Sequence, residues 1–299
     1  VGRCPAYLLD TNLPENEQHY RDLTLRVYGG DSTTRILQEI LLGIGGVRLM
    51  RALGIEPSVY HMNEGHAAFL SLELIREKLA LGKSFADALN FAKKQCIFTT
   101  HTPVEAGHDR FTASLMDYAF KGYLSHLKMS LDEVMALGRV NPNDASEPFC
   151  MTVLALKAAR AANGVSELHG QVSRHMWQCL WPGVPEDKIP IGHITNGIHL
   201  LGWMKGPVRR FWRRRLTSNG TPAAPGTTGP NTDFWNKNSS WESAINDPAF
   251  WQKMGDPNFI SDEEIWAFRY KLRRELIEFA RRRLLLQGRS LSQGDFIAF

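Results

Sequence analysis

Short apolar segments that alternate with helical patterns constrain the fold of this chain more than any other feature of its sequence. An apolar run at 56–62 is followed by two helical patterns, at 66–82 and 84–94, and then by a second apolar run at 95–101. Parallel strands need a crossover connection, and a strand, two helices and a strand within about 45 residues supply one. The sequence therefore predicts an α/β fold built on a parallel sheet.

Three other segments extend this pattern. Residues 151–180 predict a long helical region, and the apolar run at 187–195 predicts a strand that follows it. Nearer the start of the chain, residues 4–12 predict a short strand. Near its end, 261–288 predict an amphipathic helix capped by Ser261, with an acidic first turn.

Residues 31–54 predict an apolar helix that begins at Asp31 or Ser32 and ends at Gly54. Glycines 43, 45 and 46 lie inside this helical pattern, with no strand before them. A phosphate-binding glycine loop requires a preceding strand, so close helix packing is the preferred interpretation of these glycines.

Composition narrows the class of protein. Hydrophobic residues make up 43% of the 299 residues, which is enough for a large core, and the net charge of +4 gives no reason to expect a nucleic-acid partner. No apolar run approaches the ~20 residues that span a bilayer, so no membrane is expected. The cysteines are few and have no zinc-site spacing, which favours a reducing, cytoplasmic location. They are Cys4, Cys96, Cys150 and Cys179.

Three polar runs follow the predicted strands: YHMNEGHAAF at 60–69, FTTHTPVEAGHDRF at 98–111 and IGHITNGIHLLGW at 191–203. The carboxyl ends of strands in an open parallel sheet are where ligands bind. These runs are therefore candidates for a metal site, for a sugar site, or for ordinary polar loops.

A zinc site is the weakest of these interpretations. A metalloprotease helix needs its histidines four residues apart, whereas His61 and His66 are five apart and belong to a strand and a helix start. No metal is predicted. A sugar site needs side chains that pair with hydroxyl groups, and capping of loops uses the same residue types, so composition leaves these two interpretations level. The residues concerned are Glu64, His66, His101, Thr102 and Asn196.

Seven ordered motifs give the chain a resemblance to the α-glucan (glycogen, starch and maltodextrin) phosphorylases, especially their short bacterial branch. The resemblance implies the N-terminal half of a GT-B glycosyltransferase architecture, a Rossmann-like parallel sheet flanked by helices, with a helical C-terminal extension. The motifs are LLDTNLPEN, YGGDSTTRILQEILLGIGG, VYHMNEGHAAF, FTTHTPVEAGHDRF, ANGVSELHGQVSR, GHITNGIHLLGW and DEEIWAFRYKLRREL.

The resemblance also implies an activity. Phosphorylases of this family let inorganic phosphate attack the terminal glucose of an α-1,4-glucan or maltodextrin, giving glucose 1-phosphate. Their pyridoxal phosphate is held by a lysine in a second domain, which by this resemblance lies beyond Phe299, while a glycine-rich loop lies before Val1. The chain is thus expected to supply the sugar-binding wall, to hold no cofactor itself and to be inactive alone, while homo-oligomerisation stays open.

Residue roles follow by resemblance. TTHT is similar to the sugar-binding loop in which a histidine carbonyl meets the glucose at the cleavage subsite, which makes His101 the catalytic-site candidate with Thr102 beside it. NEGH places Glu64 and His66 close to the cleft. The remaining substrate-binding candidates are Asn196, in TNGIH, and Asp31, at the end of the gating loop YGGD.

The predicted domains are the N-terminal phosphorylase domain at 1–203, a basic segment and low-complexity insertion at 204–240, and a helical segment at 241–299. RRFWRRRL at 209–216 could contact nucleic acid, but a solvated helix face or a contact with the second domain is preferred. Two alternatives to phosphorolysis stay open: a non-catalytic glucan-binding module and a nucleotide-sugar glycosyltransferase of the same architecture.

Overall fold

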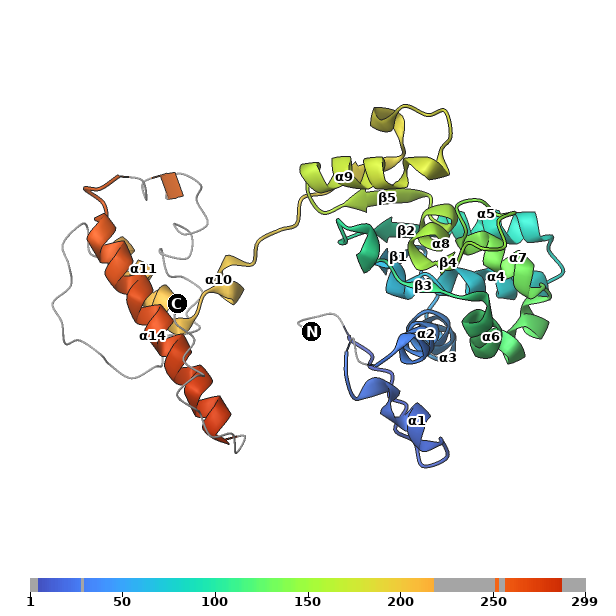
Figure 1. The fold of residues 1–299 in the computed structure, drawn as a ribbon, viewed down its shortest axis with the longest axis horizontal. Helices are drawn as coiled ribbons and strands as arrows, with labels where there is room; N and C mark the ends of the chain where they lie inside the picture. Colours follow the sequence, from blue (N-terminus) through green and yellow to red (C-terminus); the bar gives the residue numbers. More distant parts are fainter. Residues whose placement is uncertain (1–4, 28–29, 218–250, 253–255, 287–299) are drawn as a thin grey trace. The chain divides into compact units, whose positions relative to one another are not determined.

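The described part of the chain falls into two compact units that divide between Gly197 and Ile198 (Figure 1). Each unit has its own apolar cluster. The predicted domain boundaries stay a prediction, because the low-complexity insertion lies outside the described residues from 218 onward. The computed structural model describes residues 5–27, 30–217, 251–252 and 256–286.

A four-stranded parallel sheet organises the first unit and confirms the predicted α/β fold class. The strands lie in chain order across the sheet, so each crossover moves in the same direction. Right-handed crossovers of this kind place the connecting helices on one face. The strands are β1 (Tyr60–Asn63), β2 (Cys96–Thr99), β5 (Ala161–Gly164) and β6 (Ile191–His193).

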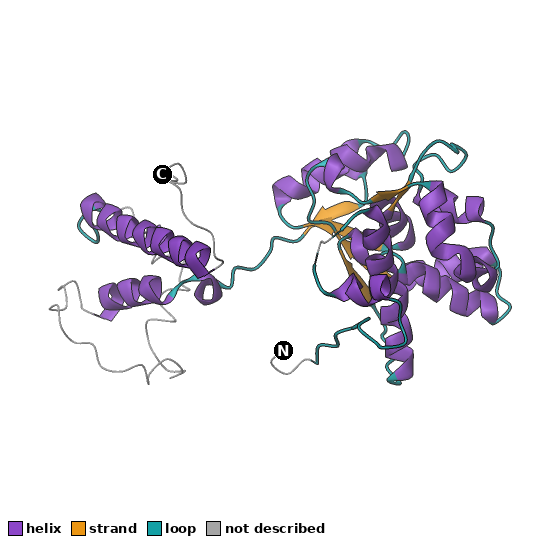
Figure 2. Cartoon of the chain, turned by 60° about the horizontal axis from the view of Figure 1, so that its bottom comes forward, coloured by secondary structure: helices purple, strands orange, loops and turns teal. Residues whose placement is uncertain are grey.

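Burial along β1 agrees with this topology. Tyr60 and Met62 are buried, whereas His61 and Asn63, on the opposite face, are exposed. The rest of the first unit is mainly helical (Figure 2). Its helices include α1 (Gln18–Arg21), α2 (Ser32–Ile40), α3 (Gly46–Ala52), α4 (Leu70–Ala80), α5 (Phe85–Gln95), α6 (Ala113–Leu127), α7 (Leu131–Gly138), α8 (Met151–Ala158) and α9 (Glu167–Trp177). Of these, α5, α8 and α9 pack directly on strands of the sheet.

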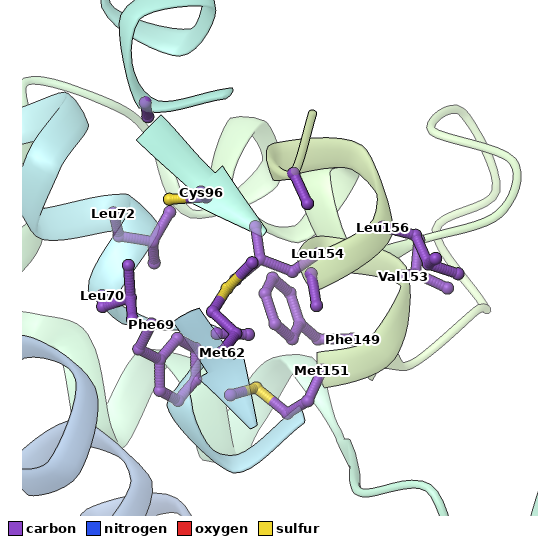
Figure 3. Close-up of a cluster of buried hydrophobic side chains, with 14 of the residues drawn as sticks. Met62, Phe69, Leu70, Leu72, Cys96, Phe149, Met151, Val153, Leu154 and Leu156 are labelled. Atoms are coloured by element: carbon purple, nitrogen blue, oxygen red, sulfur yellow. The ribbon is translucent and has the colours of Figure 1, made fainter. Parts of the chain in front are cut away.

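Aromatic rings fill the core beside the sheet. Phe69 packs edge-to-face on Phe120, with ring centroids 4.9 Å apart, and lies 5.8 Å from Phe149. Figure 3 shows Phe69, Phe149 and Met62 in the same buried cluster. Full burial of each such side chain contributes about 1.5–3 kcal/mol, so this cluster fixes α4 and α8 against the sheet.

The helix predicted over 31–54 forms, with one irregularity. Asp31 accepts a hydrogen bond from the Thr34 N–H at 2.9 Å, and Gly54 ends the helix with a φ of 68°, as predicted. A π-helical turn, Leu41–Gly45, joins α2 to α3. Close packing is confirmed only at Gly43, where a Cβ would lie 2.7 Å from the Leu70 nitrogen.

Two sequence predictions are wrong. Residues 5–12 form no strand, and Leu8 is 93% exposed, because the apolar run finds no partner strand among the described residues. The helical region predicted over 151–180 is interrupted by β5, whose sequence AANG has little strand propensity. Its pairing with β2 and β6 on either side, rather than local preference, makes it a strand.

The second unit contains α10 (Leu200–Trp203), α11 (Gly206–Thr217) and α14 (Asp262–Leu286). Ser261 caps α14 as predicted, by accepting from the Glu264 N–H at 3.3 Å. Trp212 is buried, and Phe211 stacks on Phe268 at 4.0 Å, so the aromatic rings of the basic segment pack inside the unit. None of the described helices combines the length and the apolar character that crossing a bilayer requires.

Candidate functional site

The polar runs that follow β1 and β2 meet at the carboxyl edge of the sheet. Asn63 and Thr99, the last residues of these strands, are paired in register, and Thr99 is paired in turn with Asn163 of β5. The chain leaves both strands at the same edge, so NEGH and THTP begin side by side. This is the placement that the sequence predicts for a ligand site.

Glu64 anchors the loop that follows β2. Its Oε2 accepts from the His101 N–H at 2.7 Å and from the Thr102 hydroxyl at 2.9 Å, while Oε1 accepts from the Gly65 N–H at 3.1 Å. The side chain is buried, and the backbone has a φ of 76°, a conformation that costs a residue other than glycine about 1–3 kcal/mol. The contacts of its carboxylate offset this strain.

His101 lies exposed at the mouth of the site. Its Nε2 is 2.6 Å from the Asn63 Oδ1, which accepts the imidazole proton. Because its backbone N–H is held by Glu64, both the main chain and the ring of His101 are fixed by residues at the end of β1. The geometry of the TTHT loop is therefore set by the neighbouring strand.

A charged cluster forms the other side of the site. One guanidinium nitrogen of Arg35, in α2, lies 3.0 Å from Glu39, 2.7 Å from Asp109 and 3.2 Å from the His66 Nδ1. His66 Nδ1 is also 3.4 Å from the Asp109 carboxylate. These four residues, Arg35, Glu39, His66 and Asp109, are called the charged cluster below.

The cluster shifts the pKa values of its members. Hydrogen bonds to Asp109 and Glu39 raise the pKa of His66 to about 9. Burial raises the pKa of the Glu39 carboxyl to about 7, against the opposing hydrogen bond with His66. Burial also disfavours the charged form of Asp109, yet hydrogen bonds from His66 and Arg35 outweigh it and lower the pKa of that carboxyl well below its usual range. At neutral pH the cluster thus holds a charged imidazolium beside an ionised Asp109.

Between the Glu64 anchor and the charged cluster lies an open pocket of about 610 Å³. This volume falls in the range of small-molecule sites, but its lining is polar where such sites are usually apolar. Side chains with several donors and acceptors suit a ligand that carries many hydroxyl groups. The lining residues are Arg35, Asn63, Glu64, His66, His101, Thr102, Gly107 and Asp109.

The structure brings four of the predicted site residues to this pocket, Glu64, His66, His101 and Thr102. Asn196 and Asp31 are not among its lining residues. Asn196 is exposed on the loop after β6, where its backbone N–H donates to the Val165 carbonyl at 3.0 Å. The exposed side chain of Asp31 caps α2.

Sequence reasoning missed Arg35, Glu39, Asp109 and Asn63. Asp109 lies in the polar run at 98–111, and Asn63 is the first residue of NEGH. Their positions after predicted strands could therefore have identified them as site residues. Arg35 and Glu39 have the i,i+4 spacing of a helical ion pair, which by itself indicates only a solvated helix face.

These contacts show whether the site suits a zinc ion or a cofactor. His61 donates to the Thr99 hydroxyl at 2.8 Å, whereas His66 belongs to the charged cluster. The two histidines have different partners and do not form a shared zinc site. Of the described pocket-lining residues none is a lysine, and the half-buried Lys157 donates to the carbonyls of Ala136 and Arg139. The residues at this site therefore do not fit the lysine attachment of pyridoxal phosphate.

An open parallel sheet with a polar pocket outside the carboxyl ends of its strands defines a ligand-binding α/β domain. No family model matches the chain, but it is similar in sequence to several curated proteins. The chain is similar to the maltodextrin phosphorylase of Thermococcus litoralis, 36% identical over 284 residues that cover 95% of this chain and 30% of that protein.

Two glycogen phosphorylases have a comparable sequence identity to this chain. That of Mycobacterium tuberculosis strain H37Rv is 38% identical over 296 residues, which cover 95% of this chain and 31% of that protein. That of Aquifex aeolicus is 32% identical over 278 residues, which cover 93% and 36%. The resemblance to the α-glucan phosphorylases is thereby confirmed along nearly the whole chain, which spans about a third of the length of the curated relatives it matches.

Proposed function

We propose that this chain supplies the sugar-binding wall of an α-1,4-glucan phosphorylase, which transfers a terminal glucosyl unit to inorganic phosphate and yields glucose 1-phosphate. The observation that carries the proposal is the pocket itself. Glu64, His66, His101 and Thr102, which resemble site residues of that family, line one polar pocket although NEGH and THT are far apart in sequence. The relatives named phosphorylases support the reaction class.

In this proposal each residue has a stated task. The anchored His101 presents the main chain of its loop to the glucose at the cleavage subsite, and Thr102 supports that loop through Glu64. Asn196, on the loop after β6, and Asp31, at the start of α2, are proposed to bind the glucan outside this pocket. Both belong to the first unit. Pyridoxal phosphate supplies proton transfer beside the substrate phosphate and would be held by a second GT-B domain.

A binding experiment tests the sugar site directly. The purified chain should bind maltooligosaccharides in isothermal titration calorimetry and should not bind cellooligosaccharides of equal length. His101→Ala should weaken the affinity about three- to tenfold, because the loop loses its hydrogen bond to Asn63 and one such bond is worth about 0.5–1.5 kcal/mol. His175→Ala is the matched control, since His175 is also exposed and also pairs with one side chain, Glu186.

Equal affinity of His101→Ala and the unmodified chain would place the sugar elsewhere. Equal binding of α- and β-linked oligosaccharides would also contradict a glucan-specific pocket.

The chemistry is expected to need more than this chain. Because no described pocket residue provides the cofactor lysine, the purified chain should retain no stoichiometric pyridoxal phosphate after dialysis. It should release no glucose 1-phosphate from glycogen and phosphate, as followed by a coupled phosphoglucomutase assay. Phosphorolysis at a rate comparable to that of a full-length relative would contradict the proposal that the reaction needs a second, cofactor-holding domain.

A glucan-binding module without catalysis is the second candidate, and the present pocket serves it equally well. Phosphate-dependent release of glucose 1-phosphate by a longer form of the protein separates the two. A nucleotide-sugar glycosyltransferase would instead need a nucleotide-sugar donor, would transfer its glucosyl unit to the glucan and would release the nucleotide without any need for phosphate.

A further inference from the structure

One nitrogen of the Arg35 guanidinium occupies the centre of the charged cluster. It lies within 3.2 Å of a carboxylate oxygen of Glu39, a carboxylate oxygen of Asp109 and the Nδ1 of His66. Ligand atoms of these three residues all lie within 4.8 Å of one another, a grouping that could hold a metal ion. The guanidinium therefore stands where a bound cation would stand.

The three partners come from three different segments. Glu39 belongs to α2, His66 to the short 3₁₀ helix Gly65–Ala67 after β1, and Asp109 to the end of the loop after β2. Arg35 thus links a helix to two of the segments that line the pocket. The links span 31 residues to His66 and 74 residues to Asp109.

The loop from His101 to Asp109 is fixed at both ends. Glu64 holds its start through the His101 N–H and the Thr102 hydroxyl. At its end, the Asp109 carboxylate contacts Arg35, and the Asp109 carbonyl accepts from the Met151 N–H at 3.1 Å. Thr102 and Gly107, which lie between these two anchors, both line the pocket.

Glu39 gives independent evidence that the cluster serves a purpose beyond stability. It is 2% exposed, and its Oε2 has no hydrogen-bond partner among the described residues. An incompletely paired carboxyl is costly to bury, and apolar residues would fill this position at lower cost. Its other oxygen accepts from Arg35 at 3.0 Å and so orients the guanidinium toward Asp109.

We propose that Arg35 is a positioning residue of the sugar pocket, a built-in cation that fixes Asp109 and with it the loop from 101 to 109. Glu39 orients this cation. The identity of the ligand rests on the proposed function, whereas the ordering of the loop does not. A divalent ion at Glu39, His66 and Asp109 would have to displace the guanidinium, which makes metal binding the competing outcome.

The test replaces the built-in cation by a soluble one. Arg35→Ala should weaken maltooligosaccharide binding at least tenfold, and millimolar guanidinium should restore most of that loss. Urea at the same concentration is the matched additive, because it is planar and of similar size but uncharged. Arg48→Ala is the matched variant, since Arg48 pairs with the buried Glu73 at 3.0 Å outside the pocket and its loss should leave affinity unchanged.

Hydrogen exchange supplies a readout that does not depend on sugar. In Arg35→Ala, amides from 101 to 109 should exchange at least tenfold faster, and guanidinium but not urea should slow them again. Arg35→Lys and Asp109→Asn provide milder versions if Arg35→Ala does not fold, and both should loosen the same loop. Failure of the unmodified chain to bind any glucan would remove the proposed function while leaving this exchange test intact.

The proposal is overturned by unchanged exchange over 101–109 in all three variants. It is also overturned if guanidinium and urea act alike on Arg35→Ala. One equivalent of zinc retained by the unmodified chain, and lost on His66→Gln, would show a metal site in place of the built-in cation.

Discussion

Replacing Glu64 by alanine should both abolish detectable sugar binding and lower the free energy of unfolding by about 3 kcal/mol. The carboxylate accepts from the His101 N–H and the Thr102 hydroxyl, and each hydrogen bond to a charged group is worth about 1.5–3 kcal/mol. Without it the loop after β2 loses its anchor at the start of the pocket. Urea unfolding and calorimetry with maltooligosaccharides measure the two effects.

Two companion variants make the result specific. Glu64→Gly should be about 1 kcal/mol more stable than Glu64→Ala, because glycine adopts the φ of 76° without strain. Glu147→Ala is the matched control. Glu147 also accepts from two neighbouring backbone amides, of Val140 at 2.7 Å and Asn141 at 3.0 Å, but away from the pocket. The Glu147→Ala variant should lose stability but keep its affinity for maltooligosaccharides. Normal sugar affinity in Glu64→Ala would contradict the anchoring role.

The sequence predicted those features that depend on residues close together in the chain, such as helix caps and the alternation of strands and helices. Asp31 and Ser261 cap helices as predicted, because a cap depends on a side chain and an amide only three residues away. The alternation of strands and helices predicted the parallel sheet, and the topology of such sheets then placed NEGH and THTP at one edge. That edge became the pocket.

Long-range partners decided what the sequence could not predict. AANG at 161–164 is a strand because β2 and β6 pair with it on both sides, and the apolar run near Leu8 is exposed because nothing described pairs with it. Arg35 contacts Asp109 across 74 residues, a pairing that no spacing rule contains. The resemblance supplied the residues of the sugar site, while their supports became visible only in three dimensions.

Stability of the first unit should fall by about 3 kcal/mol between pH 5 and pH 9 through the charged cluster, as measured by urea unfolding. The folded pKa of Glu39, about 7, lies above its ordinary value, so the fold binds more protons than the unfolded chain and loses stability as pH rises toward 7. The folded pKa of His66, about 9, is also raised, so its contribution is full below pH 6.5 and disappears as pH rises through 9. The two groups titrate as a pair, which makes the combined loss smaller than the sum of their separate shifts.

Two variants separate these contributions. Glu39→Gln should flatten the profile between pH 5 and pH 7, because a neutral amide needs no proton to be buried there. His66→Gln should flatten it between pH 7 and pH 9, since the imidazolium beside Asp109 is lost. Asp109, whose pKa is lowered, has the opposite sign and contributes only to the loss of stability below about pH 4. A wild-type profile that rises with pH over this window, or one that neither variant changes, would show that the cluster is not protonated as its contacts require.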